Sequence, residues 1–472
     1  MKIIFAAGES APFVKTGGLA DVIYGLGKEL VKKKNKVSIF IPFYQKVKEH
    51  QEMYEWVDAF DVAQGWRMTH ANILKLNKDG IDFYFVECDQ YFNRENVYGY
   101  DDDIERFCFF DLAVKKAIIR MKLNPDIVHV HDWHAACIPL LLADAGLTFR
   151  SVLTIHNPAF QGYFNPASLG DLLNLPRYYY DSGLMRFNDQ VSMLKTGIST
   201  CDVITTVSKT HATELLNDEY SYNGIGKTIK LREPDMFGIV NGLDVNEFNP
   251  KTDKLIPCNY DINNYKEGKK ANKAALLKRM GFSQEYSQAP VFAVVSRLTS
   301  QKGIDRILRN IERIKKYNAK LIVLGQGEYD IEQGLEWACK TYPENVKIFL
   351  GYSNELSHLI YAGADFFLMP SKFEPCGLGQ LIAMQYGTLP IVSKVGGLAD
   401  TVKSYKDSKK TANGFGFESW DENAFDYLLD YVCELYVKSK LDPLIKNAMS
   451  EDFSWARRVD EYISLYKKIL KR

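Results

Sequence analysis

The chain lacks an excess of charge of either sign. Its 472 residues include 59 lysines and arginines and 59 aspartates and glutamates, so the formal net charge is zero. Domains that bind nucleic acid usually carry a basic excess, and we therefore expect no nucleic-acid partner. Hydrophobic residues make up 46% of the chain and charged residues 25%, which is typical of a folded globular protein rather than a disordered one.

Long apolar runs and paired cysteines are also missing. No run is long enough to span a bilayer, and Met1 and Lys2 lead directly into a predicted core strand without the apolar segment of a signal peptide. The eight cysteines are scattered and include no CxxC pair, which argues against a disulfide framework and against a zinc site. We therefore expect a reduced, cytoplasmic protein that has no membrane partner.

A complete dinucleotide-binding motif is absent as well. Gly25-Leu-Gly27 and Gly325-Gln-Gly327 each lack the third glycine of GxGxxG. This absence argues against a dinucleotide-dependent oxidoreductase.

The chain contains instead two copies of the sequence GGLAD. The first lies in Lys15-Thr-Gly-Gly-Leu-Ala-Asp-Val22 and the second in Lys394-Val-Gly-Gly-Leu-Ala-Asp-Thr401. Each copy follows a predicted strand and opens a predicted helix. Glycine lets a backbone approach a ligand closely, and a helix N-terminus offers free N–H groups. We interpret the copies as two anion-binding turns that serve one phosphorylated sugar; the alternative is a pair of ordinary tight turns.

Short apolar runs alternate with helical patterns along the whole chain, which predicts parallel sheets with crossover helices. A chain of this length should form two domains. We therefore predict an α/β fold with two Rossmann-like domains. The predicted strands are Ile3–Ala7, Val37–Ile41, Phe83–Val86, Ile127–His131, Ser151–Thr154 and Val203–Val207, then Val291–Ser296, Leu321–Leu324, Val346–Leu350, Asp365–Met369 and Leu389–Ser393.

Fewer helices can be placed from the pattern. We predict them at about Leu19–Lys34, Gly303–Tyr317, Leu356–Ala362 and Leu378–Tyr386, and over the last twenty residues. The polar, lysine-rich stretch 245–290 is interpreted as a linker that leads into the second domain.

Polar residues follow several of these strands, where ligands of open parallel sheets bind. Asp132 ends a histidine-rich strand, and His156 with Asn157 ends the next one. A metal site built from the histidines and Asp132 is an alternative, although no further cluster completes a ligand shell. A His-Asn pair at this position is well placed to hydrogen-bond a substrate hydroxyl, or it is a structural pair.

Two charged groups follow strands in the second half of the chain. Arg297 and Lys302 lie just before a predicted helix, where a cation is unfavourable unless an anion binds. An arginine fork and a lysine charge are suited to a diphosphate leaving group. Glu374 also precedes a helix; it can accept hydrogen bonds from sugar hydroxyls, or it simply complements the helix dipole.

Together these motifs resemble the bacterial glycogen synthases and the related starch synthases, over essentially the whole chain. The motifs are KTGGLADV at 15–22, HVHDWH at 129–134, TIHNPAFQG at 154–162, VNGLD at 240–244, SRLTSQKG at 296–303, EPCGLGQ at 374–380, GGLAD at 396–400 and DFSW at 452–455. The resemblance implies the glycosyltransferase-B fold with its active site in an interdomain cleft. It implies an acceptor-side domain at 1–245, a nucleotide-sugar domain at 246–450, and a C-terminal helix at 451–472 that crosses back to the first domain.

The resemblance also implies roles for residues around the donor phosphates. Lys15 and the Gly17–Gly18 loop should approach the phosphates and the reacting sugar, and Arg297 and Lys302 should neutralise the diphosphate.

Other roles concern the sugar rings and the base. His156 should bond near the glucose 6-hydroxyl, and Glu374 should hold the 3- and 4-hydroxyls. The remaining implied contacts are the Cys376–Gly377 backbone beside Glu374, Tyr352 against the nucleobase, Asp132 and Asn241 near the donor and acceptor sugars, and Asp21 fixing its loop or placing the acceptor.

The implied reaction transfers glucose from ADP-glucose to the non-reducing-end 4-hydroxyl of glycogen or a maltooligosaccharide, and it retains the anomeric configuration. The expected route is front-face, with the leaving phosphate oxygen taking the acceptor proton. No carboxylate stands out as a nucleophile, and no cofactor or metal is expected because the two cations supply the charge.

The sequence departs from the family at four positions: Gly379, Val395, Pro158 and Phe160. Two alternatives therefore stay open: a synthase with a small acceptor, of the sucrose or trehalose type, and a glucan-binding relative without turnover. A phosphorylase is disfavoured because it is far longer and needs a pyridoxal-phosphate lysine. The preference for ADP-glucose over UDP-glucose, the oligomeric state, allosteric control and further glucan sites cannot be read from the sequence.

Overall fold

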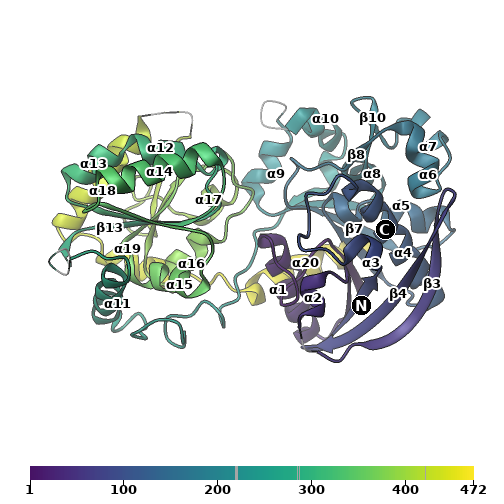
Figure 1. The fold of residues 1–472 in the computed structure, drawn as a ribbon, viewed down its shortest axis with the longest axis horizontal. Coiled ribbons are helices and arrows are strands. Elements are labelled where there is room, and N and C mark those ends of the chain that lie inside the picture. The colour runs from purple at the N-terminus through teal and green to yellow at the C-terminus, as the bar shows by residue number, and fades with distance from the viewer. Residues whose placement is uncertain (51, 218–221, 284, 286–287, 420, 422) are drawn as a thin grey trace. The chain divides into compact units, whose positions relative to one another are not determined.

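The most apolar runs of the chain form the central strands of two sheets, which are buried on both faces. The computed structural model describes residues 1–472 except 51, 218–221, 284, 286–287, 420 and 422 (Figure 1). The first unit comprises Met1–Gly242 and Trp455–Arg472, and the second comprises Leu243–Ser454. Each unit has its own hydrophobic core, as expected for a chain too long for a single one.

The first unit is built on a nine-stranded sheet with the order β12-β11-β7-β6-β1-β2-β5-β4-β3. Neighbours from β12 to β5 pair in parallel, and β4 is antiparallel to both β5 and β3. Its strands are β1 (Lys2–Ala6), β2 (Lys36–Pro42), β3 (Glu55–Gln64), β4 (Arg67–Lys78), β5 (Ile81–Glu87), β6 (Ile127–His131), β7 (Arg150–Ile155), β11 (Val203–Thr206) and β12 (Met236–Gly238).

Helices and a small second sheet complete this unit. The helices are α1 (Gly18–Lys32), α2 (Gln45–Lys48), α3 (Asp89–Phe92), α4 (Asp103–Arg120), α5 (Ile138–Asp144), α6 (Leu169–Leu173), α7 (Tyr178–Asp181), α8 (Met193–Thr200), α9 (Lys209–Leu215), α10 (Ile225–Lys230) and α20 (Trp455–Ile469). The small sheet contains β8 (Tyr163–Phe164), β9 (Arg186–Phe187) and β10 (Gln190–Ser192).

The second unit has a six-stranded parallel sheet with the order β15-β14-β13-β16-β17-β18. Counted from β13, this is the order 3-2-1-4-5-6 of a Rossmann sheet. Its strands are β13 (Val291–Val295), β14 (Lys320–Gly325), β15 (Val346–Leu350), β16 (Phe366–Met369), β17 (Leu389–Ser393) and β18 (Phe415–Phe417). The predicted α/β class is confirmed for both units.

The second unit also contains helices that precede, connect or follow the strands of its sheet. They are α11 (Tyr265–Arg279), α12 (Ile304–Arg309), α13 (Ile311–Lys316), α14 (Tyr329–Thr341), α15 (Asn354–Gly363), α16 (Gly379–Gln385), α17 (Gly396–Thr401), α18 (Ala424–Val437) and α19 (Asp442–Ser450). Across the part of the chain that the structure describes, no helix has both the length and the apolar character needed to cross a bilayer.

Every predicted strand is present, with ends that differ by a residue or two. Three expectations were wrong or incomplete. The sheet of the first unit is not purely parallel, because the hairpin of β3 and β4 was missed. The stretch 245–290 is more than a linker, since it contains α11. The helix predicted over 303–317 is two short helices that meet at Asn310, whose φ of −103° and ψ of 10° interrupt the helical backbone.

The last helix, α20, packs into the core of the first unit. Its Trp455 is buried against Gly25 in α1 and against Gly242. Further along, the Tyr466 hydroxyl lies 2.7 Å from Nδ1 of His129 on β6. The helix is therefore bound to the central strands of this sheet as well as to α1.

The contact between Gly25 and Trp455 leaves no room for a side chain. A Cβ at residue 25 would lie 2.2 Å from Nε1 of Trp455. We predict that Gly25→Ala lowers stability by about 1–3 kcal/mol, the usual cost of overpacking. Thermal unfolding should detect the loss. The control is Gly170→Ala in α6, where the nearest atom would be 3.8 Å away; equal stability of the two variants would contradict the prediction.

Candidate active site

In each unit, candidate residues follow the two strands at which the strand order of the sheet reverses. In an open α/β sheet, ligands bind at the carboxyl ends of the two strands on either side of this switch point. In the first unit these strands are β1 and β6, which are followed by Glu9 and Asp132. In the second unit they are β13 and β16, which are followed by Arg297 and Glu374.

The loop after β1 folds back over a buried glutamate. Glu9 is 2% exposed, and its Oε2 accepts hydrogen bonds from the Thr16 backbone N–H at 2.7 Å and from the Thr16 hydroxyl at 2.5 Å. The residues on the outer side of this loop, Lys15 to Gly18, are exposed. Nζ of Lys15 lies 2.8 Å from Asp21 in the first turn of α1, so Asp21 restrains Lys15 within its own loop.

Neither backbone strain nor packing explains the glycine at position 17. Its φ of −158° is an extended conformation that any residue adopts. A Cβ there would meet only Oε1 of Glu9 at 3.9 Å, which is ordinary contact. The position is open on its exposed side, as expected where a ligand approaches the backbone.

The loop after β7 is also bound to a buried carboxylate. Oδ1 of Asp132 accepts the backbone N–H of His156 at 2.7 Å and that of Asn157 at 3.3 Å. Asp132 itself has a φ of 55°, a region that costs a non-glycine residue about 1–3 kcal/mol. Burial raises the pKa of Asp132 to about 7, against the lowering effect of the two N–H donors.

Of the histidines of this region, His129 and His131 are buried and His156 is half-buried, and these three are bonded to one another or to neighbouring hydroxyls. Nδ1 of His131 lies 3.1 Å from Nε2 of His156, and Nε2 of His129 lies 2.6 Å from the Thr154 hydroxyl. Burial lowers the pKa of His156 and His129 to about 3, so both rings are neutral at physiological pH. A neutral His156 can hydrogen-bond a sugar hydroxyl without adding charge.

The described residues include no group of three or more His, Cys, Asp or Glu that could hold a metal ion. Asn241 is 6% exposed, and within this part of the chain its side-chain oxygen has no hydrogen-bond partner. The amide therefore keeps an unused acceptor at the end of the first unit.

In the second unit, Lys302 and Glu374 form an ion pair. Nζ of Lys302 donates to Oε2 of Glu374 at 2.6 Å, and the Ser371 hydroxyl donates to the same oxygen at 3.2 Å. Glu374 is 5% exposed, whereas Arg297 is an exposed residue on the loop after β13. The structure therefore brings Lys302 and Glu374 together in this unit, a contact that the sequence did not predict.

The second GGLAD copy has a packing role that the first lacks. A Cβ at Gly396 would lie 2.0 Å from the Glu374 carbonyl oxygen, and one at Gly397 would lie 2.4 Å from Cα of Cys376. The Gly397 N–H also donates to the Pro375 carbonyl at 3.0 Å. These glycines let α17 approach the 374–376 segment. Packing therefore accounts for the second pair of glycines, and the interpretation of both copies as anion-binding turns stays a prediction.

The side chain of Gln380 holds the segment after Glu374 in place. Its amide donates to the carbonyls of Cys376 and Gly377, both at 3.0 Å, and to the Thr401 hydroxyl at 3.2 Å. Gly377 has a φ of 76°, which favours glycine. Tyr352 lies elsewhere on the same sheet edge, after β15, and its ring is 74% exposed. An exposed ring can stack on a planar ligand.

Two departures from the family have local structural settings. A Cβ at Gly379 would lie 2.8 Å from the ring of Phe367, so a larger residue would require that ring to move. Val395 stands at the N-cap of α17 and makes no side-chain cap. The structure therefore gives a packing reason for Gly379.

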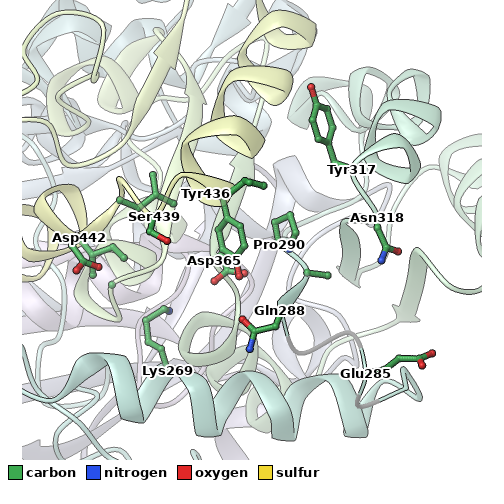
Figure 2. A pocket seen from close by; sticks show the side chains of 15 residues that line it. Lys269, Glu285, Gln288, Pro290, Tyr317, Asn318, Asp365, Tyr436, Ser439 and Asp442 are labelled. Atoms are coloured by element: carbon green, nitrogen blue, oxygen red, sulfur yellow. The ribbon is translucent and has the colours of Figure 1, made fainter.

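A separate cavity of about 610 Å³ lies at the opposite edge of the second sheet. Its lining includes residues that precede strands, among them Pro290 before β13, Asn318 before β14 and Asp365 before β16. Figure 2 shows these side chains together with Lys269 and Tyr436. Since the candidate site residues follow the strands, this cavity does not belong to their site.

The sequence analysis missed Glu9, Ser371 and Gln380. Glu9 lies three residues after β1 and six residues before Lys15, and a carboxylate just after a predicted strand is a signal that could have identified it. Ser371 and Gln380 make hydrogen bonds that depend on how their loops fold, so no local pattern identifies them.

The contrast between the glycine motifs generates a stability prediction. Gly397→Ala should lower stability by about 1–3 kcal/mol because backbone atoms of Cys376 must move. Gly17→Ala should unfold at nearly the wild-type temperature, since its Cβ meets nothing closer than 3.9 Å. Calorimetry of both variants measures this, and similar losses in the two would show that packing does not distinguish the motifs.

The raised pKa of Asp132 generates a pH prediction. The folded protein keeps this proton up to about pH 7, whereas the unfolded chain loses it near the ordinary value of 3.8. Stability from this group therefore falls as pH rises between these values. The comparison variant is Asp132→Asn, which keeps an acceptor oxygen. The melting temperature of the wild type minus that of this variant should be lower at pH 8 than at pH 5. A difference in melting temperature that does not change with pH would contradict this.

Two family models match the chain. One, described as a starch synthase catalytic domain, matches residues 2–230, and the other, glycosyl transferases group 1, matches residues 279–450. The chain is 40% identical to a glycogen synthase of Streptococcus mutans over 478 residues, which covers 99% of this chain and 100% of that protein.

The comparison with solved structures supports the same family assignment. The catalytic domain of starch synthase IV from Arabidopsis thaliana, bound to ADP and acarbose, has a TM-score of 0.91 and 32% identity, with 100% of this chain and 99% of that one covered. Sucrose-phosphate synthase from Thermosynechococcus elongatus has a TM-score of 0.64 at 15% identity, with both chains fully covered, and shares the fold alone. The chain therefore belongs to the glycogen and starch synthase family of hexosyltransferases, with the glycosyltransferase-B fold.

Proposed function

We propose that this protein transfers glucose from ADP-glucose to the 4-hydroxyl at the non-reducing end of an α-1,4-glucan, with retention of configuration and release of ADP. The ion pair of Lys302 and Glu374 at the switch point of the second sheet carries the proposal. It is supported by the glycogen synthase of Streptococcus mutans and by the plant starch synthase that was solved with ADP. The cytoplasmic location stays a prediction.

The second unit supplies groups for the two ends of a nucleotide sugar. The Lys302 ammonium has three donors and uses one on Glu374, so it can bind a phosphate oxygen at the same time. Arg297 can add a planar fork to the diphosphate. Glu374, held by Lys302 and Ser371, keeps acceptor capacity for the 3- and 4-hydroxyls of glucose. Tyr352 can stack on the adenine, and the Cys376–Gly377 backbone can flank the sugar.

The first unit supplies groups for the reacting sugar and the acceptor. We assign Lys15 and the open backbone at Gly17 and Gly18 to the phosphate and the anomeric region. His156, which is neutral, can bond the 6-hydroxyl without stabilising a competing charge. Asp132 places the backbone of His156 and Asn157.

Asn241 and Asp21 complete the proposed set. The unused amide oxygen of Asn241 can accept a hydroxyl proton from a sugar. Asp21 pairs with Lys15, which supports the role of fixing its loop.

The carboxylates of this set are already engaged, which favours a front-face route. Asp132 accepts two backbone N–H groups and Glu374 is paired with Lys302, so neither is a free nucleophile. As the bond to the anomeric carbon breaks, negative charge develops on the departing phosphate, where Arg297 and Lys302 can stabilise it. The phosphate oxygen then takes the proton of the attacking 4-hydroxyl. In this scheme the two cations supply the charge that a metal would otherwise provide.

The test is transfer of radiolabelled glucose from ADP-glucose and UDP-glucose onto glycogen, onto maltooligosaccharides and onto free monosaccharides, with and without a chelator. We expect incorporation into glucan from ADP-glucose that the chelator does not abolish. Incorporation into a monosaccharide alone would identify a small-acceptor synthase, and no incorporation by folded protein would identify a relative without turnover.

Single substitutions should locate the chemistry. Lys302→Ala and Glu374→Ala should each lower kcat/KM by about 10²–10³-fold, the usual cost of removing a group that stabilises developing charge. Lys372→Ala is the control, because Lys372 forms an exposed ion pair with Asp305 nearby and should leave transfer unchanged. Near-normal turnover in either site variant would refute the assignment.

A further inference from the structure

Glu9 is a buried carboxylate to which the proposed chemistry gives no role. It lies three residues beyond the end of β1, at the base of the loop that leads to α1. Its partner is Thr16, which sits between Lys15 and Gly17, so the contact reaches the exposed outer side of the loop. Glu9 therefore touches the same short segment that is proposed to meet the donor.

The two sides of the loop are fixed by different means. On the inner side, Ser10 pairs with Val14, and the Ala11 N–H donates to the Ala20 carbonyl at 3.2 Å. On the outer side, Lys15 to Gly18 are exposed, and Thr16 makes two hydrogen bonds to Glu9. The geometry of the exposed segment therefore depends on this carboxylate.

Glu9 also lies close to the start of α1, where a Cβ at Gly17 would be 3.9 Å from its Oε1. Gly17 is the N-cap of α1 and has no side chain to accept the first N–H groups of the helix. Burial raises the pKa of Glu9, and the hydroxyl and N–H of Thr16 together with the N–H groups of Ala20 and Gly17 lower it. The carboxylate thus lies beside both the loop and the helix start, and Thr16 in the loop donates both of its hydrogen bonds.

The support beneath Glu9 is rigid. The Tyr44 hydroxyl donates to the Gly8 carbonyl at 2.8 Å, and Tyr44 is fully buried. A Cβ at Gly8 would lie 2.7 Å from the Tyr98 hydroxyl oxygen and 3.1 Å from the ring of His134. The backbone next to Glu9 is held between these side chains, so the carboxylate is a fixed point for the loop above it.

We propose that Glu9 is a positioning residue for the donor, which holds the Lys15–Gly18 segment in the conformation that receives the diphosphate and the reacting sugar. This inference rests on the proposed function of that segment. Glu9 lies under the loop and acts through Thr16, without touching the substrate.

The test compares Glu9→Ala, Glu9→Gln and Thr16→Val in the full-length protein. Glu9→Ala removes both hydrogen bonds to Thr16, so we expect the KM for ADP-glucose to rise about tenfold or more, the effect of losing hydrogen bonds to a charged group. Glu9→Gln keeps an acceptor oxygen and should restore donor KM to within about threefold of wild type. Thr16→Val keeps the N–H donor and loses the hydroxyl, so its donor KM should lie between those of the wild type and Glu9→Ala.

The KM for glycogen and the melting temperature separate positioning from folding. Both should stay near wild type in Glu9→Gln and Thr16→Val, since the changes are confined to the donor loop. Glu29→Ala is the control: it removes a carboxylate near the far end of α1, one that pairs with Lys32, and should change neither KM.

An unchanged donor KM in Glu9→Ala, or a Glu9→Gln variant as impaired as Glu9→Ala, would overturn the proposal. If Glu9→Ala does not fold, Thr16→Val decides: an unchanged donor KM overturns the proposal and a raised one supports it. A wild-type protein without transfer would overturn the proposed function instead, so the two failures are distinct.

Discussion

The structure of the first unit depends on two buried carboxylates that accept backbone N–H groups. Glu9 holds the loop that enters α1, and Asp132 holds the loop that follows β7. Burying a carboxylate is costly unless it is hydrogen-bonded, and these two are satisfied largely by main-chain donors of exposed loops. The hydrogen bonds to these carboxylates fix the geometry of the two loops. The geometry of the backbone in both loops is therefore set by buried side chains.

In the second unit, glycines allow the close packing that holds the corresponding loop in place. Its site loop, from Glu374 to Gly377, is held by backbone of α17 that comes close only because positions 396 and 397 have no Cβ. The five identical residues GGLAD thus meet different constraints in the two units: open space at Gly17 and tight packing at Gly396 and Gly397. Identical sequences within one chain thus have different packing environments.

The sequence allowed the sheets and most of the site to be predicted, because both depend on local patterns. Buried strands are continuous apolar runs, and the candidate residues Asp132, His156 and Glu374 lie within a few residues after them. The missed features depend on contacts between distant segments or on weak local signals. The strands β3 and β4 mix polar and apolar residues, α11 has little apolar character, and the partner of Glu9 is fixed only when the loop folds back. Which residues lie after strands was predictable; what holds them there was not.

The return of α20 to the first unit has a consequence for synthesis. The second unit is inserted between residues 242 and 455, and the surface of α1 around Gly25 is covered by Trp455 from beyond that insertion. During translation, the second unit is complete before the helix that finishes the first unit has been made. Until α20 has been made, the first unit has an uncovered apolar face, and His129 lacks its bond to Tyr466. This holds even though the strands of the first unit are synthesised before the second unit. In this chain the order of synthesis and the order of completion are opposite.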